Sequence, residues 1–199
     1  MKRMIRQTSR IPNLGGKRAV ALHRPHGNVS ALLRQLAAIG LEAQALWPNL
    51  PDDVREADFL FFDVDMVCDG QFPWEPGEAP MPLIALIGSE APGRIEWAMS
   101  HRADAHLVKP IGSAGIYSTL LIALQKFEER RVLMAEVATL RAQVSERRII
   151  VAAVLRLMKG GMSEDEAFTA LRAVAMRRRV TLEFAARTIV QESPQQQFG

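Results

Sequence analysis

Between residues 18 and 110, short runs of apolar residues alternate with stretches in which apolar side chains recur at helical spacing. This alternation is typical of an α/β layer fold, in which parallel strands are covered by helices. The run FLFF at 59–62 is apolar at consecutive positions, so it predicts an inner strand buried on both faces. The pattern predicts a doubly wound, five-stranded parallel sheet with strands at 19–22, 42–46, 59–64, 83–87 and 105–108.

The first helix is predicted from apolar residues at helical spacing: Leu32, Leu33, Leu36 and Ile39. We expect Asn28 to cap its N-terminus, because an asparagine side chain can accept a hydrogen bond from a free N–H group of the first turn. We expect Gly40 to end the helix, because glycine adopts the left-handed conformation at little cost.

Proline then separates a loop from a long helix. The segment 69–82, DGQFPWEPGEAPMP, contains four prolines, each of which fixes φ and lacks a backbone donor, so a loop is predicted. From residue 113 to 159 there is no proline, and one long helix is predicted. At a rise of about 1.5 Å per residue it would be on the order of 60 Å long. That is too long to pack wholly against one small sheet.

The middle of this helix carries a short heptad seam. Its apolar positions are spaced four, three and four residues apart and are flanked by charged residues: Leu133, Val137, Leu140 and Val144. The stripe could dock on its own domain or pair with a second chain. We favour a homodimer, because a helix of this length has too little of its own protein nearby to cover it.

The last third of the chain predicts three short helices around a small core. Gly160 and Gly161 end the first helix, Ser163 and Glu166 form a capping box for the second, and Thr181 caps the third. Ile150, Val151, Val154 and Leu155 are expected on the inner face of the first helix, and Leu182, Ala185, Ala186, Ile189 and Val190 on that of the third. The residues predicted to form the centre of this core are Ala153, Met158, Ala167, Phe168, Leu171 and Ala175.

The chain is therefore divided into five parts: a flexible basic N-terminus (1–16), an α/β domain (17–125), a coiled-coil linker helix (126–146), a three-helix domain (147–192) and a disordered tail (193–199). No apolar run is long enough to cross a bilayer, and a cytoplasmic protein is expected. Cys68 is the only cysteine, which excludes an internal disulfide. No metal site, cofactor motif or catalytic constellation is visible, so we do not expect an enzyme.

Positive charge is concentrated near the C-terminus, although the formal net charge is only +3. A local basic surface of this kind favours RNA, whose phosphates and splayed bases suit the planar guanidinium group. The alternative is that these charges only solvate the outside of a small domain. The predicted RNA-binding residues are Arg156, Lys159, Arg172, Arg177, Arg178 and Arg179.

Two motifs give the sheet domain a resemblance to CheY-like response-regulator receivers: DFLFFDVDM at 58–66 and RADAHLVKP at 102–110. The resemblance places Asp63 at the phosphoacceptor position and Lys109 at the lysine that pairs with the phosphoryl group.

Other receiver positions have changed. The two acids that hold Mg²⁺ in receivers are replaced by His23 and Arg24, and Ile87 stands where receivers have Ser or Thr. Without metal ligands, the incoming phosphoryl group would meet uncompensated negative charge. We therefore predict a pseudo-receiver, in which Asp63 and Lys109 form only an ion pair at the strand ends.

The C-terminal segment resembles an ANTAR domain, the RNA-binding module of antitermination regulators. The resemblance rests on GMSEDEAFTALRAVAM at 161–176 and on Ala153, Leu157 and Met158 in the preceding helix. The first helix departs from the usual pattern, with Val154 in place of a common lysine and Arg156 in place of a common leucine.

Together the two halves resemble the AmiR/NasT-type antitermination regulators. That resemblance implies a homodimer that binds stem-loops in a leader transcript. It also implies control by a ligand-sensing partner protein of the periplasmic-binding-protein type rather than by phosphorylation. Two alternatives remain open: a response regulator phosphorylated at Asp63, and a DNA-binding transcription factor.

Overall fold

The computed structural model describes residues 12–66 and 70–191 of the chain. Predictions about residues 1–11, about Cys68 and about the tail at 193–199 lie outside these residues. The chain divides into two compact units, Met1–Arg131 and Val132–Gly199. Each is described by itself. In the described part of the chain, no helix combines the length and the apolar character that a membrane span requires.

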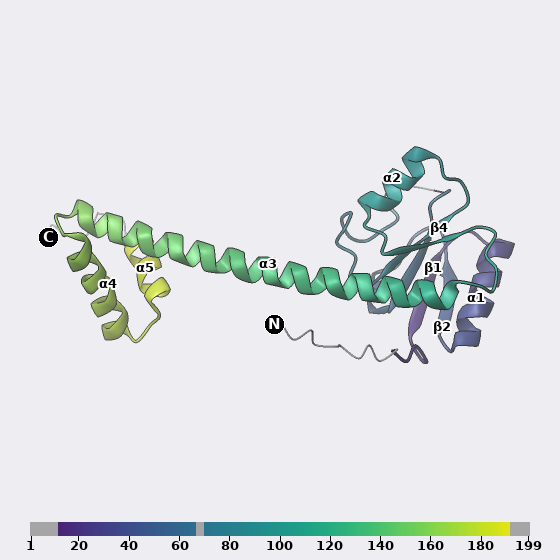
Figure 1. Cartoon of the computed structure of the whole chain (residues 1–199), viewed down its shortest axis with the longest axis horizontal. Coiled ribbons are helices and arrows are strands. Elements are labelled where there is room, and N and C mark those ends of the chain that lie inside the picture. The colour runs from purple at the N-terminus through teal and green to yellow at the C-terminus, as the bar shows by residue number, and fades with distance from the viewer. Residues whose placement is uncertain (1–11, 67–69, 192–199) are drawn as a thin grey trace, which may run out of the picture. The chain divides into compact units, whose positions relative to one another are not determined.

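The first unit contains a five-stranded parallel sheet in the order β2-β1-β3-β4-β5 (Figure 1). The predicted doubly wound, CheY-like fold is therefore confirmed. Each strand lies within one residue of its predicted bounds: β1 (Arg18–Leu22), β2 (Glu42–Leu46), β3 (Phe59–Asp63), β4 (Leu83–Ile87) and β5 (Ala105–Val108).

Both faces of the sheet are buried, as the FLFF run predicts. Phe59 and Phe61 of β3 pack on the side of helix α1 (Gly27–Ile39) and the first turns of helix α3 (Ile116–Lys159). Leu60 and Phe62 point to the opposite face, which is covered by helix α2 (Pro92–Ser100) and the 3-10 helix η1 (Asp52–Glu56).

The proline-rich segment covers β3 with aromatic rings instead of a helix. The described residues between β3 and β4 form turns and bends. Phe72 lies edge-on to Phe62 at 5.7 Å between ring centroids and stacks on Trp97 of α2 at 5.9 Å. Trp74 stacks on the other side of Phe72. This stack seals the second face of the sheet where a covering helix would otherwise be needed.

The start of α1 differs from the prediction. His26, not Asn28, is its N-cap, and its ring nitrogen accepts a hydrogen bond from the Asn28 N–H. The Asn28 side chain instead accepts a hydrogen bond from the N–H of Ile111, and this bond connects the start of α1 to the loop that follows β5. The predicted end is correct, because Gly40 is left-handed with φ 98°.

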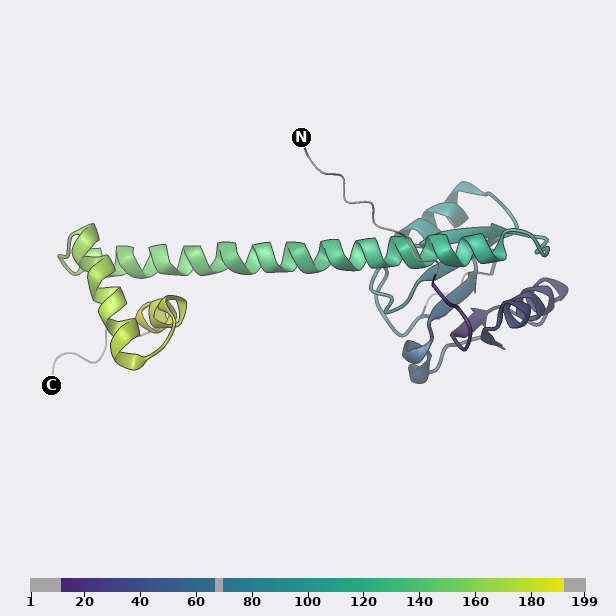
Figure 2. The ribbon, with the colours of Figure 1, turned by 60° about the horizontal axis from the view of Figure 1, so that its bottom comes forward.

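The second unit is built on α3, whose last turns pack against α4 (Glu164–Arg178) and α5 (Leu182–Gln191) (Figures 1 and 2). The capping box of Ser163 and Glu166 is present, and the Thr181 hydroxyl accepts from the Phe184 N–H at the start of α5. The fully buried residues of its core are small apart from one leucine: Ala153, Ala167, Leu171, Ala185 and Ala186.

Part of the predicted core of the second unit is wrong. Met158 is exposed, as are Val151 and Leu155, whereas Leu157 packs against the core. The inner face of α3 therefore follows Ile150, Ala153 and Leu157. The reason is that α3 carries a second apolar stripe, whose residues Val151 and Leu155 lie two positions before Ala153 and Leu157 and therefore on the opposite side of the helix.

Candidate functional site

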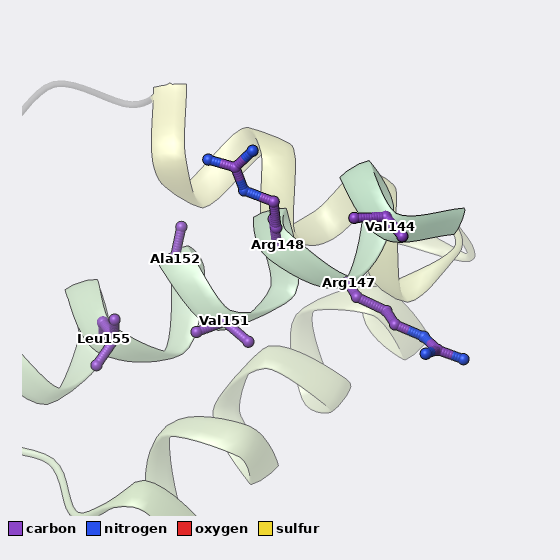
Figure 3. A pocket seen from close by; sticks show the side chains of 6 residues that line it. All are labelled: Val144, Arg147, Arg148, Val151, Ala152 and Leu155. Atoms are coloured by element: carbon purple, nitrogen blue, oxygen red, sulfur yellow. The ribbon is translucent and has the colours of Figure 1, made fainter. Parts of the chain in front are cut away.

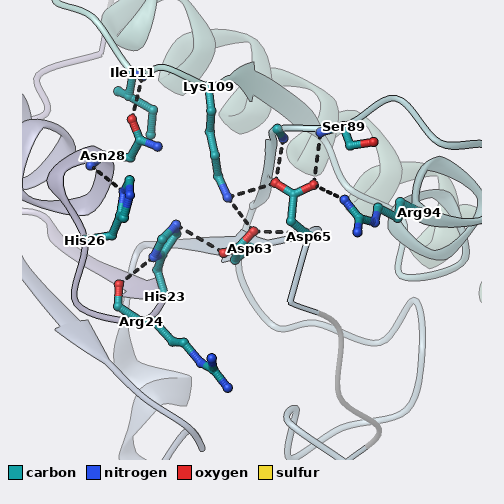
Figure 4. Close-up of polar contacts among 11 residues, drawn as sticks. His23, Arg24, His26, Asn28, Asp63, Asp65, Ser89, Arg94, Lys109 and Ile111 are labelled. Carbon is teal, nitrogen blue, oxygen red and sulfur yellow. Dashed lines mark hydrogen bonds and ion pairs between the residues drawn. The ribbon is translucent and has the colours of Figure 1, made fainter.

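Asp63 ends β3 in a buried ion cluster at the carboxyl edge of the sheet, and only 4% of it is exposed (Figure 4). The Lys109 ammonium group lies 2.5 Å from its Oδ1, so the structure contains the strand-end ion pair that the sequence predicts. His23 lies on the other side of Asp63, with Nε2 3.1 Å from Oδ2. An ammonium group and an imidazole ring thus face one carboxylate.

The contacts of the His23 ring fix one of its protons. Its Nδ1 lies 2.6 Å from the backbone carbonyl oxygen of Arg24, and a carbonyl can only accept, so Nδ1 carries a hydrogen. The Nε2 atom is buried and close to Asp63 but lacks the alignment of a hydrogen bond.

Asp65 is the second carboxylate of the cluster and has more partners than Asp63. Its oxygens accept from the N–H groups of Gly88 and Ser89, the Arg94 guanidinium and the Lys109 ammonium, at 2.7 to 3.0 Å. Burial raises the pKa of the Asp65 carboxyl. Lys109 and the two N–H groups outweigh burial, so the net pKa lies below its usual value.

These residues do not fit the Mg²⁺ that a working receiver uses. Mg²⁺ requires a near-octahedral set of oxygen ligands. Here the oxygens of Asp63 and Asp65 already face Lys109, His23 and Arg94. His23 and Arg24 offer nitrogen and positive charge at the positions where receivers carry acids. Metal-assisted phosphoryl transfer to Asp63 has no support in this donor set.

Incubation of the full chain with acetyl phosphate and Mg²⁺ is therefore expected to leave Asp63 unmodified. Lys109 and His23 occupy the oxygens that would attack phosphorus or bind metal. Intact-mass spectrometry would measure the outcome, with the Asp63→Asn variant treated in parallel as the baseline. A phosphoryl adduct in the wild type that is missing from Asp63→Asn would contradict the prediction.

The structure separates the predicted RNA-binding residues into two groups. Arg177, Arg178 and Arg179 are exposed at the C-terminal end of α4, and Arg172 is exposed on the same helix. Lys159 ends α3, next to the start of α4. The 15 residues of α4 rise by roughly 20 Å, so Lys159 is far from the arginine cluster.

The Arg156 and Arg172 side chains have contacts within the unit. The Arg156 guanidinium donates to the carbonyl oxygen of Val190 at 2.9 Å and thereby joins α3 to the end of α5. The structure therefore gives Arg156 a part in holding the unit together. The Arg172 guanidinium lies over the Phe168 ring, 5.2 Å from its centroid, while the residue remains exposed.

The predicted dimerisation residues form part of an exposed apolar stripe on α3. Leu133, Leu140 and Val144 are more than half exposed, and Val137 is partly exposed. Further along, Val144, Val151 and Leu155 line a shallow groove together with Ala152 and the stems of Arg147 and Arg148 (Figure 3). The stripe thus continues beyond the predicted linker at 126–146.

Sequence reasoning missed most partners in the ion cluster. Gly88, Ser89 and Arg94 come from the end of β4 and from α2, and the fold brings them to Asp65. The only signal in the sequence is the D-x-D spacing of Asp63 and Asp65. Since strand residues alternate in direction, this spacing places both side chains on one side of the strand end.

A receiver-like five-stranded sheet precedes α3, and α3 continues into a small helical unit. Comparison with protein families identifies both parts of the chain. Residues 18–124 match the family described as AmiR, N-terminal, and residues 138–190 match the ANTAR domain. The chain belongs to this family and is an ANTAR regulator of the AmiR/NasT type.

Among curated proteins, the chain is similar to the transcriptional regulatory protein PdtaR of Mycobacterium tuberculosis, strains CDC 1551 / Oshkosh and ATCC 25618 / H37Rv. The identity is 31% over 111 residues, which cover 55% of this chain and 54% of the relative. The chain thus spans about half the length of the curated relatives it matches.

Solved structures with similar folds include two receiver proteins. One is the signal receiver domain of a modulated diguanylate cyclase from Desulfovibrio desulfuricans G20, with a TM-score of 0.47, 16% identity, and coverage of 57% of this chain and 98% of that chain. The other is full-length FixJ from B. japonicum, with a TM-score of 0.45, 14% identity, and coverage of 87% and 98%.

Proposed function

We propose that this chain is an RNA-binding antitermination regulator that acts in the cytoplasm on leader-transcript hairpins as a homodimer. The observation that supports the proposal most is the placement of Arg177, Arg178 and Arg179. All three are exposed where α4 turns towards α5, inside the segment that matches the ANTAR domain. Three guanidinium groups at one corner of a small helical unit can bind phosphates and stack on unpaired bases.

Control by a partner protein agrees better with the ion cluster than control by phosphorylation. Asp63 is buried, and its partners are the side chains of Lys109 and His23 rather than ligands for Mg²⁺. A signal must then reach the chain through its surface. The resemblance to AmiR/NasT-type regulators implies a ligand-sensing protein of the periplasmic-binding-protein type, which would release the regulator when its ligand binds.

RNA binding is expected to weaken steeply with salt and to depend on the arginine cluster. Each phosphate contact contributes roughly 0.7 to 0.9 to the slope of log affinity against log salt concentration. The double variant Arg177→Ala with Arg178→Ala is expected to lower affinity for a leader stem-loop by roughly tenfold or more and to reduce that slope. Fluorescence anisotropy with labelled stem-loops over a salt series would measure both.

The matched control is Arg34→Ala with Lys126→Ala, which removes the same charge from exposed positions of the first unit. It is expected to leave RNA affinity nearly unchanged. Unlabelled duplex DNA serves as a competitor in the same assay. If affinity is flat across salt, if both double variants behave alike, or if DNA displaces the RNA at equal concentration, the proposed RNA surface is wrong.

A further inference from the structure

Four hydrogen-bond donors from three separate parts of the first unit converge on the carboxylate of Asp65 (Figure 4). Gly88 and Ser89 contribute consecutive backbone N–H groups just after β4, at 2.7 and 3.0 Å. Arg94 contributes a guanidinium N–H from α2 at 2.7 Å, and Lys109 contributes its ammonium group from the end of β5 at 3.0 Å.

This set of donors is the kind that proteins use to bind small oxyanions. Consecutive backbone N–H groups form a concave anion site, and charge-assisted bonds from lysine and arginine are about twice as strong as neutral ones. Without Asp65, the Arg94 guanidinium and the two N–H groups would lose this acceptor, and Lys109 would keep only Asp63. The carboxylate therefore occupies an anion site that the surrounding backbone and side chains have already built.

The backbone at residue 88 is shaped around the carboxylate. A Cβ atom added to Gly88 would lie 2.4 Å from Asp65 Oδ2 and 3.2 Å from its Cγ. Such a contact is far inside van der Waals distance, so any side chain at position 88 would push the carboxylate out of place. Glycine allows the approach that puts its N–H 2.7 Å from Asp65.

Asp63 does not fill this role, although it lies in the same cluster. Its Oδ1 faces Lys109 and accepts from the N–H of Asp65, and its Oδ2 faces His23. Among the residues that the structure describes, Asp63 makes no polar contact with the loop after β4. Lys109, the residue that the receiver resemblance assigns to the phosphoryl group, is shared between Asp63 and Asp65.

We propose that the Asp65 carboxylate is a built-in substitute for a bound oxyanion, which holds the β4–α2 loop and Lys109 permanently in an anion-bound arrangement. Removal of the carboxylate would turn this corner of the sheet into a binding site for a small oxyanion such as inorganic phosphate. The proposal does not depend on RNA binding, because every group it uses belongs to the first unit.

The test compares thermal unfolding of the full chain and its Asp65→Ala variant in sodium phosphate and in sodium chloride of equal ionic strength. Phosphate stabilises folded proteins in general more than chloride does, so the wild type is expected to show only this small, non-specific rise in the unfolding temperature of the first unit. Asp65→Ala is expected to unfold at a lower temperature in chloride and to recover in phosphate. At phosphate concentrations about ten times the dissociation constant, the recovery should be about 3 to 6 °C.

Two control variants show whether the recovery arises at this site. Asp58→Ala removes another carboxylate bound by a lysine and a backbone N–H, in this case Lys17 and Arg18. The unfolding temperature of Asp58→Ala should rise in phosphate no more than that of the wild type. The double variant Asp65→Ala with Lys109→Ala should not show the phosphate-specific rise in unfolding temperature, because it lacks a principal cation of the site. The proposal would be overturned if phosphate raised the unfolding temperatures of the wild type and Asp65→Ala equally, or if it did not raise that of Asp65→Ala.

A second measurement covers the case in which Asp65→Ala does not fold. Asp65→Asn keeps the shape of the side chain but lacks its charge. The proposal then requires the Gly88 and Ser89 amide hydrogens to exchange at least roughly tenfold faster than in the wild type, while those of β1 and β3 stay unchanged. Unchanged exchange at both amides would show that the carboxylate does not hold the loop.

Discussion

Replacement of Leu140 and Val144 by aspartate is expected to convert the protein from a dimer into a monomer. Both side chains are more than half exposed in the single chain and lie on the heptad seam of α3. Pairing with a second α3 would bury each of them, and full burial of a leucine or valine contributes about 1.5 to 3 kcal/mol. A carboxylate at the same place would have to lose its water without a partner. The expected change in the dimer dissociation constant is therefore at least roughly a thousandfold.

Sedimentation velocity over a range of protein concentrations would measure this change. The matched control is Ala135→Asp with Ala142→Asp, which adds the same charge to exposed positions on the opposite side of α3. That control is expected to remain dimeric. If the seam variant keeps the wild-type dissociation constant, or if the wild type is a monomer at micromolar concentration, α3 does not mediate dimerisation.

Leu171→Ala is expected to unfold the second unit while the sheet unit remains folded. Leu171 is fully buried in α4, and the other fully buried residues described in this core are alanines, so its removal leaves a cavity. Substitutions of this kind cost about 2 to 5 kcal/mol. A three-helix core of this size supplies only about 3 to 5 kcal/mol in total. The loss is thus comparable with the whole stability of the unit, and RNA affinity should fall with it.

Hydrogen exchange followed by mass spectrometry distinguishes the two units in the full chain. Peptides from α4 and α5 of Leu171→Ala should exchange rapidly, whereas peptides from β1, β3 and β4 should remain protected. Phe184→Ala is the control, because that aromatic side chain is 56% exposed and its removal leaves little cavity. Protection of α4 in Leu171→Ala equal to that in the wild type would show that the core does not depend on this leucine.

The sheet and the helix caps could be predicted from the sequence because their signals are local. Consecutive apolar residues in FLFF require burial on both faces, and both faces are indeed buried. The capping box needs only Ser163 and Glu166 three residues apart. The cap of α1 was predicted at the wrong residue, because the contact that engages the Asn28 side chain comes from Ile111, far along the chain.

The inner face of α3 could not be fixed from its own residues. Two apolar stripes run along this helix two residues out of phase, through Ala153 and Leu157 on one side and through Val151 and Leu155 on the other. Hydrophobic periodicity shows that both stripes exist but not which of them meets α4 and α5. Only the packed structure separates the core from the stripe that remains exposed.

The ion cluster was predicted only in part. Asp63 and Lys109 were found because both lie in receiver-like motifs at strand ends. The role of Asp65 depends on the path of the backbone at Gly88 and on a side chain from α2, and neither is encoded near Asp65 in the sequence. Contacts of that kind arise from topology, so a search for local motifs does not detect them.

The residue that ends α4 is an arginine in a backbone conformation that suits glycine. Arg179 has φ 53° and ψ 44°, and its N–H caps the last turn of the helix. A side chain in this left-handed region costs about 1 to 2 kcal/mol, which glycine would avoid. Glycine would also remove a cation from the corner where α4 meets α5. The helix thus ends at an energetic disadvantage that places a third exposed arginine directly after Arg177 and Arg178.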